Sequence, residues 1–424
     1  MKTSHMLVHE ARTAVLCLAV LSGCAEASND TTGGGATSTV SSGGGGAGGS
    51  STTDGGGGAG AGSSTTTSST TTSSTTTTTT YVDPGDTVLL LAGGPTGLVA
   101  GQYSPGGSWQ MTDIEGTTTD PVTITPAWGP QLWSTGLFRS SADQLPYSIL
   151  WTPSTFGAPE PIDDEPVLGG PSVYTESARI YAAFQRADGT YATSYRQGPG
   201  GGWTFLSEVK HFAGGQPVIS EGPHAPYIGH LEGARAIGFA GEDGDMYYQL
   251  AANLTWEPPV ALGVPGTSSR RPVFAESLLQ GLIVWTQDDG QAMSKQYITF
   301  VDTPPPAQVA GVISDDPVAL AYSPSNPMTR FLIAYRGLDG MLYLTHSVGS
   351  QWSPPELLFG GVQILGSPAL GIGFQGSPEW AELAFISADQ GDVHHSRLVA
   401  GTWTDPEKIA GPGFESVAIQ GAPF

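Results

Sequence analysis

Short apolar runs separated by turn residues are the main pattern of this chain, and the clearest example lies within residues 331–348. An apolar and aromatic run ends at Tyr335, Asp339-Gly340 follows, and a second run alternates apolar and polar residues as far as Val348. An Asp-Gly pair between two β-prone runs predicts a β-hairpin, here with a type I′ turn, in which both central residues have positive φ.

The same unit recurs roughly every 49 residues, which is a period typical of repeat architectures. An aromatic residue such as Tyr335 stands four residues before the turn Asp, and a Trp such as Trp352 follows the turn Gly by twelve residues, with Pro354 close behind. A short Pro-led apolar segment precedes five of the hairpins, beginning at Pro171, Pro226, Pro272, Pro317 and Pro368. Each unit therefore predicts four strands: a small apolar one, the two hairpin strands, and an outer one that carries Trp and Pro. The turns are Asp188-Gly189, Asp243-Gly244, Asp289-Gly290 and Asp339-Gly340, with degenerate versions at Gly97, Asp143-Gln144 and residues 389–391.

Seven such units predict an all-β fold, a seven-bladed β-propeller of four-stranded antiparallel blades over residues 81–424. The first unit begins with its hairpin at residues 87–91 and lacks an innermost strand, whereas the chain ends with an unused one at 416–419. We therefore expect the C-terminal strand to complete the first blade and close the ring. The recurring Trp is expected to pack as a wedge between neighbouring blades.

The N-terminus has the features of an export signal. Lys2 and Arg12 precede an apolar run at 13–21, which is too short to span a bilayer, so residues 1–23 are expected to be a signal peptide. The run ends in Leu-Ser-Gly-Cys24, which resembles the lipobox of bacterial lipoproteins. That resemblance implies that Cys24 is acylated and tethers the protein to a membrane through lipid, and Ala25 after it implies the outer membrane of the cell envelope. The alternative is a plain secreted protein that is cleaved nearby.

Composition separates a tether from the folded region. Residues 24–80 are almost only Gly, Ser, Thr and Ala, so they predict a disordered linker that cannot bury enough apolar surface to fold. The formal net charge of −23 repels phosphate backbones, which argues against nucleic acid as a partner. Cys17 and Cys24 are the only cysteines, so no disulfide or thiol chemistry is expected in residues 81–424.

The repeat of aromatic, Asp-Gly turn, Trp and Pro resembles the seven-bladed bacterial lectins of the Photorhabdus type and, more distantly, the six-bladed fungal fucose-binding lectins. This resemblance implies a carbohydrate-binding, lectin-like head. The fucose lectins place an Arg, a Glu and an aromatic residue between blades, with the Glu shortly after the turn. None of the five segments after the turns carries that Glu, so those residues are not transferred to this chain.

Candidate chemistry is sparse. Arg186 and Arg336 lie beside turns, with Tyr191 and Tyr343 nearby, and a planar donor beside an aromatic ring is a common way to hold a sugar or a carboxylate. We take these four residues as ligand-binding candidates. No pattern predicts a metal site, a cofactor or a catalytic residue.

Two other functions stay open: a non-catalytic scaffold that binds an envelope protein, and a sialidase-like glycosidase. The segment Ser387-Ala-Asp389-Gln-Gly391 matches only the first part of a sialidase Asp-box, and no spacing of the arginines predicts that three of them converge.

Overall fold

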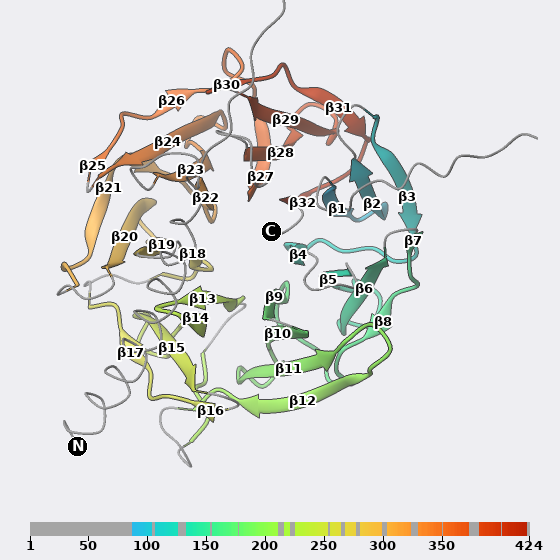
Figure 1. Cartoon of the computed structure of the whole chain (residues 1–424), viewed down its shortest axis with the longest axis vertical. Helices are drawn as coiled ribbons and strands as arrows, with labels where there is room; N and C mark the ends of the chain where they lie inside the picture. Colours follow the sequence, from blue (N-terminus) through green and yellow to red (C-terminus); the bar gives the residue numbers. More distant parts are fainter. Residues whose placement is uncertain are drawn as a thin grey trace, which may run out of the picture. The chain divides into compact units, whose positions relative to one another are not determined.

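A computed structural model describes residues 87–421, apart from 104–106, 126–132, 153–154, 177, 211–215, 221–224, 253–254, 264–267, 277–279, 299–302, 324–329, 350, 373–380 and 400. The signal peptide, Cys24 and the linker predicted from the sequence lie outside these residues. The described residues form seven antiparallel sheets around a central axis, which confirms the seven-bladed β-propeller (Figure 1).

We number the blades along the chain, starting with the sheet that holds the first hairpin. Blade 1 contains β1 (Val88–Gly94), β2 (Gly97–Tyr103), β3 (Gln110–Ile114) and β32 (Ser416–Gly421). Blade 2 contains β4 (Thr123–Thr125), β5 (Ser134–Arg139), β6 (Pro146–Thr152), β7 (Thr155–Phe156) and β8 (Glu160–Pro161). Blade 3 contains β9 (Ser172–Glu176), β10 (Arg179–Gln185), β11 (Tyr191–Gln197) and β12 (Trp203–Glu208).

The remaining four blades follow the same order from the axis outward. Blade 4 contains β13 (Tyr227–Leu231), β14 (Ala234–Ala240), β15 (Met246–Ala252), β16 (Thr255–Trp256) and β17 (Val260–Ala261). Blade 5 contains β18 (Val273–Glu276), β19 (Gln280–Thr286), β20 (Gln291–Ile298) and β21 (Ala307–Ile313). Blade 6 contains β22 (Ala319–Ser323), β23 (Arg330–Arg336), β24 (Leu342–Val348), β25 (Gln351–Trp352) and β26 (Glu356–Leu357). Blade 7 contains β27 (Ile364–Ile372), β28 (Ala381–Ser387), β29 (Val393–Val399), β30 (Thr402–Trp403) and β31 (Glu407–Ala410).

The C-terminal strand closes the ring as the sequence predicts. β32 pairs antiparallel with β1, with Leu90 opposite Ile419, so the last strand of the chain is the innermost strand of the first blade. The Ser416 hydroxyl then accepts a hydrogen bond from the Val122 N–H of blade 2 at 2.8 Å. Closure therefore joins the chain end both to its own blade and to the next one.

The hairpin turns differ from the predicted type I′. In blade 3 the Arg186 N–H donates to the Thr190 carbonyl and the Gly189 N–H donates to the Arg186 carbonyl, at 2.8 and 2.9 Å. Gly189 has a φ of +85°, whereas Asp188 is not among the described residues with positive φ. This is a type I turn followed by a left-handed glycine, the usual three-residue hairpin loop. Asp is favoured because its carboxylate accepts N–H bonds within the turn, as Asp188 does from Thr190 at 2.9 Å.

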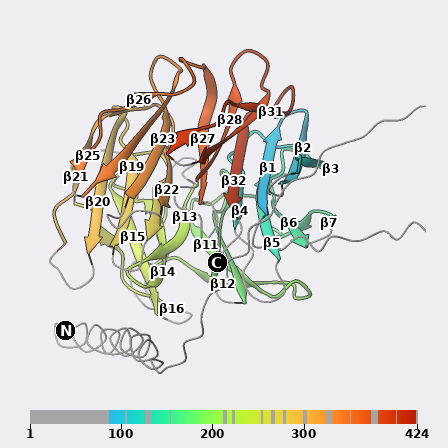
Figure 2. The same ribbon diagram turned by 45° about the horizontal axis from the view of Figure 1, so that its top comes forward.

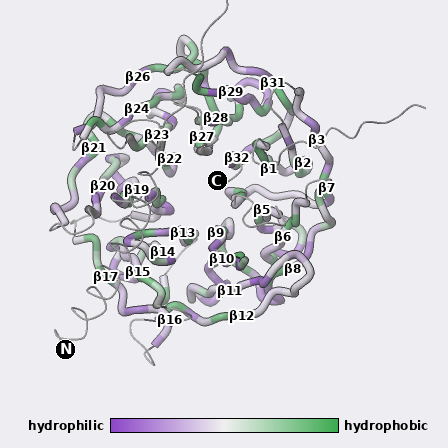
Figure 3. The backbone as a smooth tube through the Cα atoms, in the orientation of Figure 1, coloured by the Kyte–Doolittle hydropathy of each residue, from purple (hydrophilic) through white to green (hydrophobic). Residues whose placement is uncertain are grey.

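The strands run side by side through the thickness of the ring, so their turns gather on two opposite faces (Figure 2). We call the face that carries the Asp-Gly hairpin turns, such as residues 241–245 and 337–341, the turn face. Hydrophobic colour follows strands with neighbours on both sides, such as β1 and β28, whose residues are buried throughout (Figure 3). The outer strand is interrupted in blades 2, 4, 6 and 7. There the chain leaves the sheet between the two short pieces, where prolines such as Pro258 and Pro354 remove backbone donors.

The Trp wedge is confirmed, and it always points toward the preceding blade. The indole N–H of Trp203 donates to Ser148 of blade 2 at 2.8 Å, and that of Trp256 donates to Thr193 of blade 3 at 3.4 Å. Ser148 and Thr193 occupy the same position in the third strand of their blades. At this position each hydroxyl accepts a hydrogen bond from the Trp of the next blade along the chain. We call this position the Trp-acceptor slot.

Candidate functional site

The clearest local arrangement on the turn face is a seven-residue motif that occurs twice. The pattern Gly-x-Asp-Gly-x-x-Tyr fits residues 241–247 in blade 4 and 337–343 in blade 6. The Tyr247 hydroxyl donates to the Asp243 carboxylate at 2.5 Å, and the Tyr247 ring stacks on Phe239 with centroids 6.0 Å apart. A Cβ on Gly241 would lie 2.6 Å from the Tyr247 ring, so the motif needs glycine where the ring lies on the backbone.

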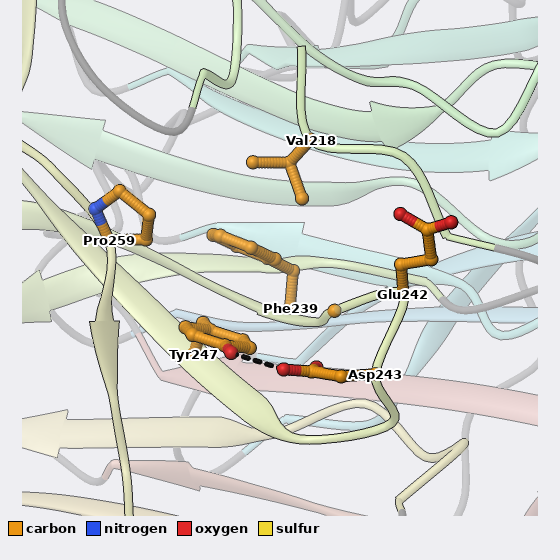
Figure 4. Close-up of a pocket in the computed structure, with 7 residues that line it drawn as sticks. Val218, Phe239, Glu242, Asp243, Tyr247 and Pro259 are labelled. Carbon is orange, nitrogen blue, oxygen red and sulfur yellow. Dashed lines mark hydrogen bonds between the residues drawn. The ribbon is translucent and has the colours of Figure 1, made fainter. Parts of the chain in front are cut away.

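In blade 4 this motif forms one wall of a pocket of about 290 Å³. Val218, on the segment that leaves blade 3, forms the other side, so the pocket lies where blades 3 and 4 meet. In Figure 4 Phe239 lies between Val218 and Tyr247, with the proline on one side and the two carboxylates on the other. The lining residues are Val218, Phe239, Gly241, Glu242, Asp243, Tyr247 and Pro259.

Tyr191 of blade 3 packs against the pocket residue Phe239 from the core. The Tyr191 ring is fully buried and packs on Phe239 with centroids 5.2 Å apart. Its hydroxyl donates to the Ala240 carbonyl of blade 4 at 2.9 Å. A buried aromatic with its hydroxyl satisfied holds its neighbour in one position. Tyr191, a residue we selected from the sequence, therefore lies in the core behind the pocket rather than on its surface.

The pocket carries acceptors and no cation among its lining residues. Glu242 is exposed, and no described residue forms an ion pair or hydrogen bond with its carboxylate. Asp243 accepts from the Tyr247 hydroxyl and from the Asp245 N–H at 3.0 Å, which leaves lone pairs on both oxygens. The hydrogen bond to Asp243, with burial as a second cause, raises the pKa of Tyr247 to about 12. The site is therefore suited to a ligand that donates hydrogen bonds and offers an apolar face.

The second copy of the motif, in blade 6, has a different surface. Tyr343 donates to Asp339 at 2.8 Å and stacks on Tyr335, as its counterpart does in blade 4. However, the Tyr335 hydroxyl reaches the Gly311 carbonyl of blade 5 at 3.4 Å, whereas Phe239 has no hydroxyl to cross the equivalent space. Leu338, 61% exposed, replaces Glu242. The blade 6 copy thus keeps the scaffold of the motif without its free carboxylate.

The two arginines selected from the sequence are engaged in ion pairs far from each other in the ring. Arg186 pairs with Asp163 at 2.9 Å, and its guanidinium lies over Phe205 at 4.9 Å. Arg336 pairs with Asp316 at 3.1 Å and donates to the Ile364 carbonyl of blade 7 at 3.0 Å. Arg336 and Tyr343 lie on the two strands of the blade 6 hairpin, whereas Arg186 and Tyr191 belong to the hairpin of blade 3.

Sequence reasoning missed Glu242, Asp243 and Tyr247. The available signal was the spacing from the turn: Tyr247 and Tyr343 both follow the turn Asp by four residues, whereas Tyr191 follows Asp188 by three. Since successive strand side chains point to opposite faces, that single step separates a pocket residue from a core residue.

A second cluster of charged groups lies between blades 7 and 1. The fully buried Glu382 accepts from Arg397 Nε and from His395 Nε2, both at 2.7 Å, while His395 Nδ1 accepts from the Trp109 indole at 3.3 Å. The Arg397 guanidinium lies over the Tyr103 ring at 4.6 Å. Because Glu382 has no exposed surface, we interpret this cluster as part of the blade interface.

Two features of the described part of the chain bear on other functions. No group of three or more His, Cys, Asp or Glu residues there is arranged to hold a metal ion. The same residues include no helix that is long and apolar enough to cross a membrane.

No family model matches the chain, and no curated protein matches it in sequence. Among solved structures it is similar to the periplasmic gluconolactonase PpgL of Pseudomonas aeruginosa, at 10% identity and a TM-score of 0.53, over 80% of this chain and 100% of that one. It is similar to AofleA from Arthrobotrys oligospora, at 8% identity and a TM-score of 0.51, over 72% and 91% of the two chains. The Aleuria aurantia lectin, a six-bladed β-propeller with a fucose recognition mode, matches at 10% identity and a TM-score of 0.47, over 70% and 96%. At identities this low, the likeness to PpgL and AofleA shows the β-propeller fold alone.

Proposed function

We propose that the propeller is a lectin-like binding head that holds a glycan in the pocket between blades 3 and 4. The observation that carries the proposal is the combination of aromatic and apolar walls with carboxylates that keep free lone pairs. Sugars present hydroxyl donors and an apolar C–H face to such a surface, and binding sites of this kind place few polar groups in a mostly apolar cavity. At about 290 Å³ the pocket has room for one or two sugar rings.

A glycan array with the purified full chain is the first test, followed by titration of the sugar class that binds. Replacing Tyr247→Ala removes the aromatic wall and should weaken binding about tenfold, or ~1.4 kcal/mol. Tyr343→Ala is the matched control, since it removes the same ring from the same motif in blade 6. The proposal fails if the array is blank, if both variants bind like the wild type, or if only the blade 6 variant loses affinity.

We also propose that the chain is exported and attached to the cell envelope through lipid on Cys24. The lipobox resemblance of residues 21–24 supports this, and the linker of residues 24–80 would hold the head away from the membrane. Cys24→Ser should move the protein from the membrane fraction to the soluble fraction and abolish labelling by a radioactive fatty acid. Cys17→Ser, a change within the leader itself, should leave both unchanged. Continued labelling of the Cys24→Ser protein would rule out this attachment site.

A further inference from the structure

Arg271 is a partly buried arginine without an acidic partner. Its Nε and Nη1 are shielded from solvent, and among the described residues they have no hydrogen-bond partner and Arg271 has no carboxylate partner. Apart from Arg179, whose guanidinium lies over the Tyr195 ring at 5.9 Å, every other arginine whose side chain the structure describes forms an ion pair. These are Arg139, Arg186, Arg196, Arg235, Arg270, Arg336 and Arg397.

Arg271 lies on the turn face, close to the axis of the ring. It stands two residues before β18, the innermost strand of blade 5, at the end where Val273 pairs with Val284 on the way to the hairpin turn. Its guanidinium lies over the ring of Tyr227, the first residue of the innermost strand β13 of blade 4, at 5.9 Å. β13 and β18 are neighbouring innermost strands (Figure 1). Arg271 is therefore placed where blades 4 and 5 meet, whereas the pocket described above lies where blades 3 and 4 meet.

Comparison with the other blades shows how the position of Arg271 differs. In blades 2 and 6 the residue just before the proline that precedes the innermost strand is an aspartate, Asp120 and Asp316. Each pairs with an arginine at the end of the second strand of its own blade, Arg139 at 2.6 Å and Arg336 at 3.1 Å. In blade 5 the acid is replaced by Arg271 and the arginine position holds Thr286. The charge at this position is therefore reversed, and no described carboxylate of blade 5 pairs with Arg271.

An unpaired guanidinium in this environment is costly. Burial lowers the pKa of Arg271, yet an arginine stays protonated at neutral pH, so the charge persists. Buried charges in proteins are otherwise paired, and an unsatisfied buried group is a common sign of a bound ion or ligand. A guanidinium presents its donors as a planar fork that fits two oxygens of one carboxylate, sulfate or phosphate.

We propose that Arg271 anchors a binding site for a small oxyanion at the junction of blades 4 and 5. The oxyanion is either the carboxylate of an acidic sugar or an inorganic phosphate or sulfate, since these present the same pair of oxygens. Tyr227 forms the apolar side of the site and keeps the guanidinium in place. This site is independent of the pocket between blades 3 and 4 and would stand if that pocket bound nothing.

Isothermal titration of the full chain tests the proposal, with sodium phosphate, sodium glucuronate and neutral glucose as separate ligands at matched ionic strength. We expect phosphate or glucuronate to bind at one site and glucose not to bind there. If only glucuronate binds, the ligand is an acidic sugar. If phosphate binds equally well, the ligand is a free inorganic anion. Failure of both anions to bind would overturn the proposal.

Variants separate a site from a general salt effect. Arg271→Met should reduce anion affinity at least tenfold and should fold, because it replaces an unpaired charge by an apolar chain of similar length. Arg179→Met, which removes another arginine without a carboxylate partner, should bind like the wild type. Should Arg271→Met not fold, Arg271→Lys keeps the charge without the planar fork and should still weaken binding. Equal anion binding in the wild type and in the Arg271 variants would overturn the assignment.

Discussion

The two interfaces on either side of blade 7 use the same tryptophan wedge with different chemistry. Where blade 1 meets blade 7, the Trp109 indole donates to His395, which fills the Trp-acceptor slot. Where blade 7 meets blade 6, Trp403 packs into an apolar cluster and the slot holds Leu344. The Trp403 indole nitrogen is buried and has no hydrogen-bond partner among the described residues. The indole N–H of Trp109 is therefore hydrogen-bonded in a polar contact, whereas that of Trp403 lies in an apolar contact without an acceptor in the described part of the chain.

The difference extends behind the slot. His395 accepts from Trp109 through Nδ1, so its proton lies on Nε2, which donates to the buried Glu382. Glu382 also holds Arg397. At the other interface the neighbouring groups are apolar, with Leu332, Leu344 and Leu383 in one cluster. Apolar contacts tolerate many alignments, whereas a buried network is satisfied in only one. We infer that the network fixes the register of the interface where the last section of chain must find the first.

Among the predictions for the two interfaces, the largest loss of folding stability should come from removing Glu382, the centre of the network. Glu382→Ala leaves the largely buried Arg397 without this carboxylate and removes the acceptor of His395. The change should lower the free energy of unfolding by about 3–5 kcal/mol. Equilibrium denaturation in urea measures the change, with Glu356→Ala on the exposed outer strand β26 as the control, expected within about 0.5 kcal/mol. A loss below about 1 kcal/mol for Glu382→Ala would mean that the network contributes little to this interface.

The sequence predicts most of the frame and little of the site, for reasons visible in single residues. The number of blades, the closing strand and the Trp wedge follow from a pattern that the units repeat. That pattern does not tell which neighbouring blade the Trp contacts. The hairpin type was wrong because only the glycine, as at Gly189, has positive φ, and an Asp-Gly pair suits both turn types. The partners of Arg186 and Arg336 are acids about twenty residues upstream, on connecting segments without a periodic signal.

The pocket depends on residues that differ between copies of the repeat, and such differences do not appear in the shared pattern. Phe239 and Tyr335 occupy one position in the repeat, and a single hydroxyl decides whether the side chain reaches the neighbouring blade. Likewise, Arg271 occupies in blade 5 the repeat position that Asp120 and Asp316 occupy in blades 2 and 6. The chemistry of a repeat protein is found where one copy departs from the others.

The two tryptophans allow the smallest and most direct test of the comparison. Trp109→Phe and Trp403→Phe remove similar ring area from equivalent wedges, so their losses of packing should nearly cancel. Trp109→Phe also leaves His395 Nδ1 without its donor, whereas Trp403→Phe deletes a donor that had no partner. Since an orphaned buried acceptor costs roughly 1–3 kcal/mol, Trp109→Phe should be the more destabilising by about 1 kcal/mol. Urea denaturation of both variants under one set of conditions gives this difference. If the two variants lose equal stability, the indole–histidine hydrogen bond adds nothing to closure, and the register must be set by Glu382 and Arg397 alone.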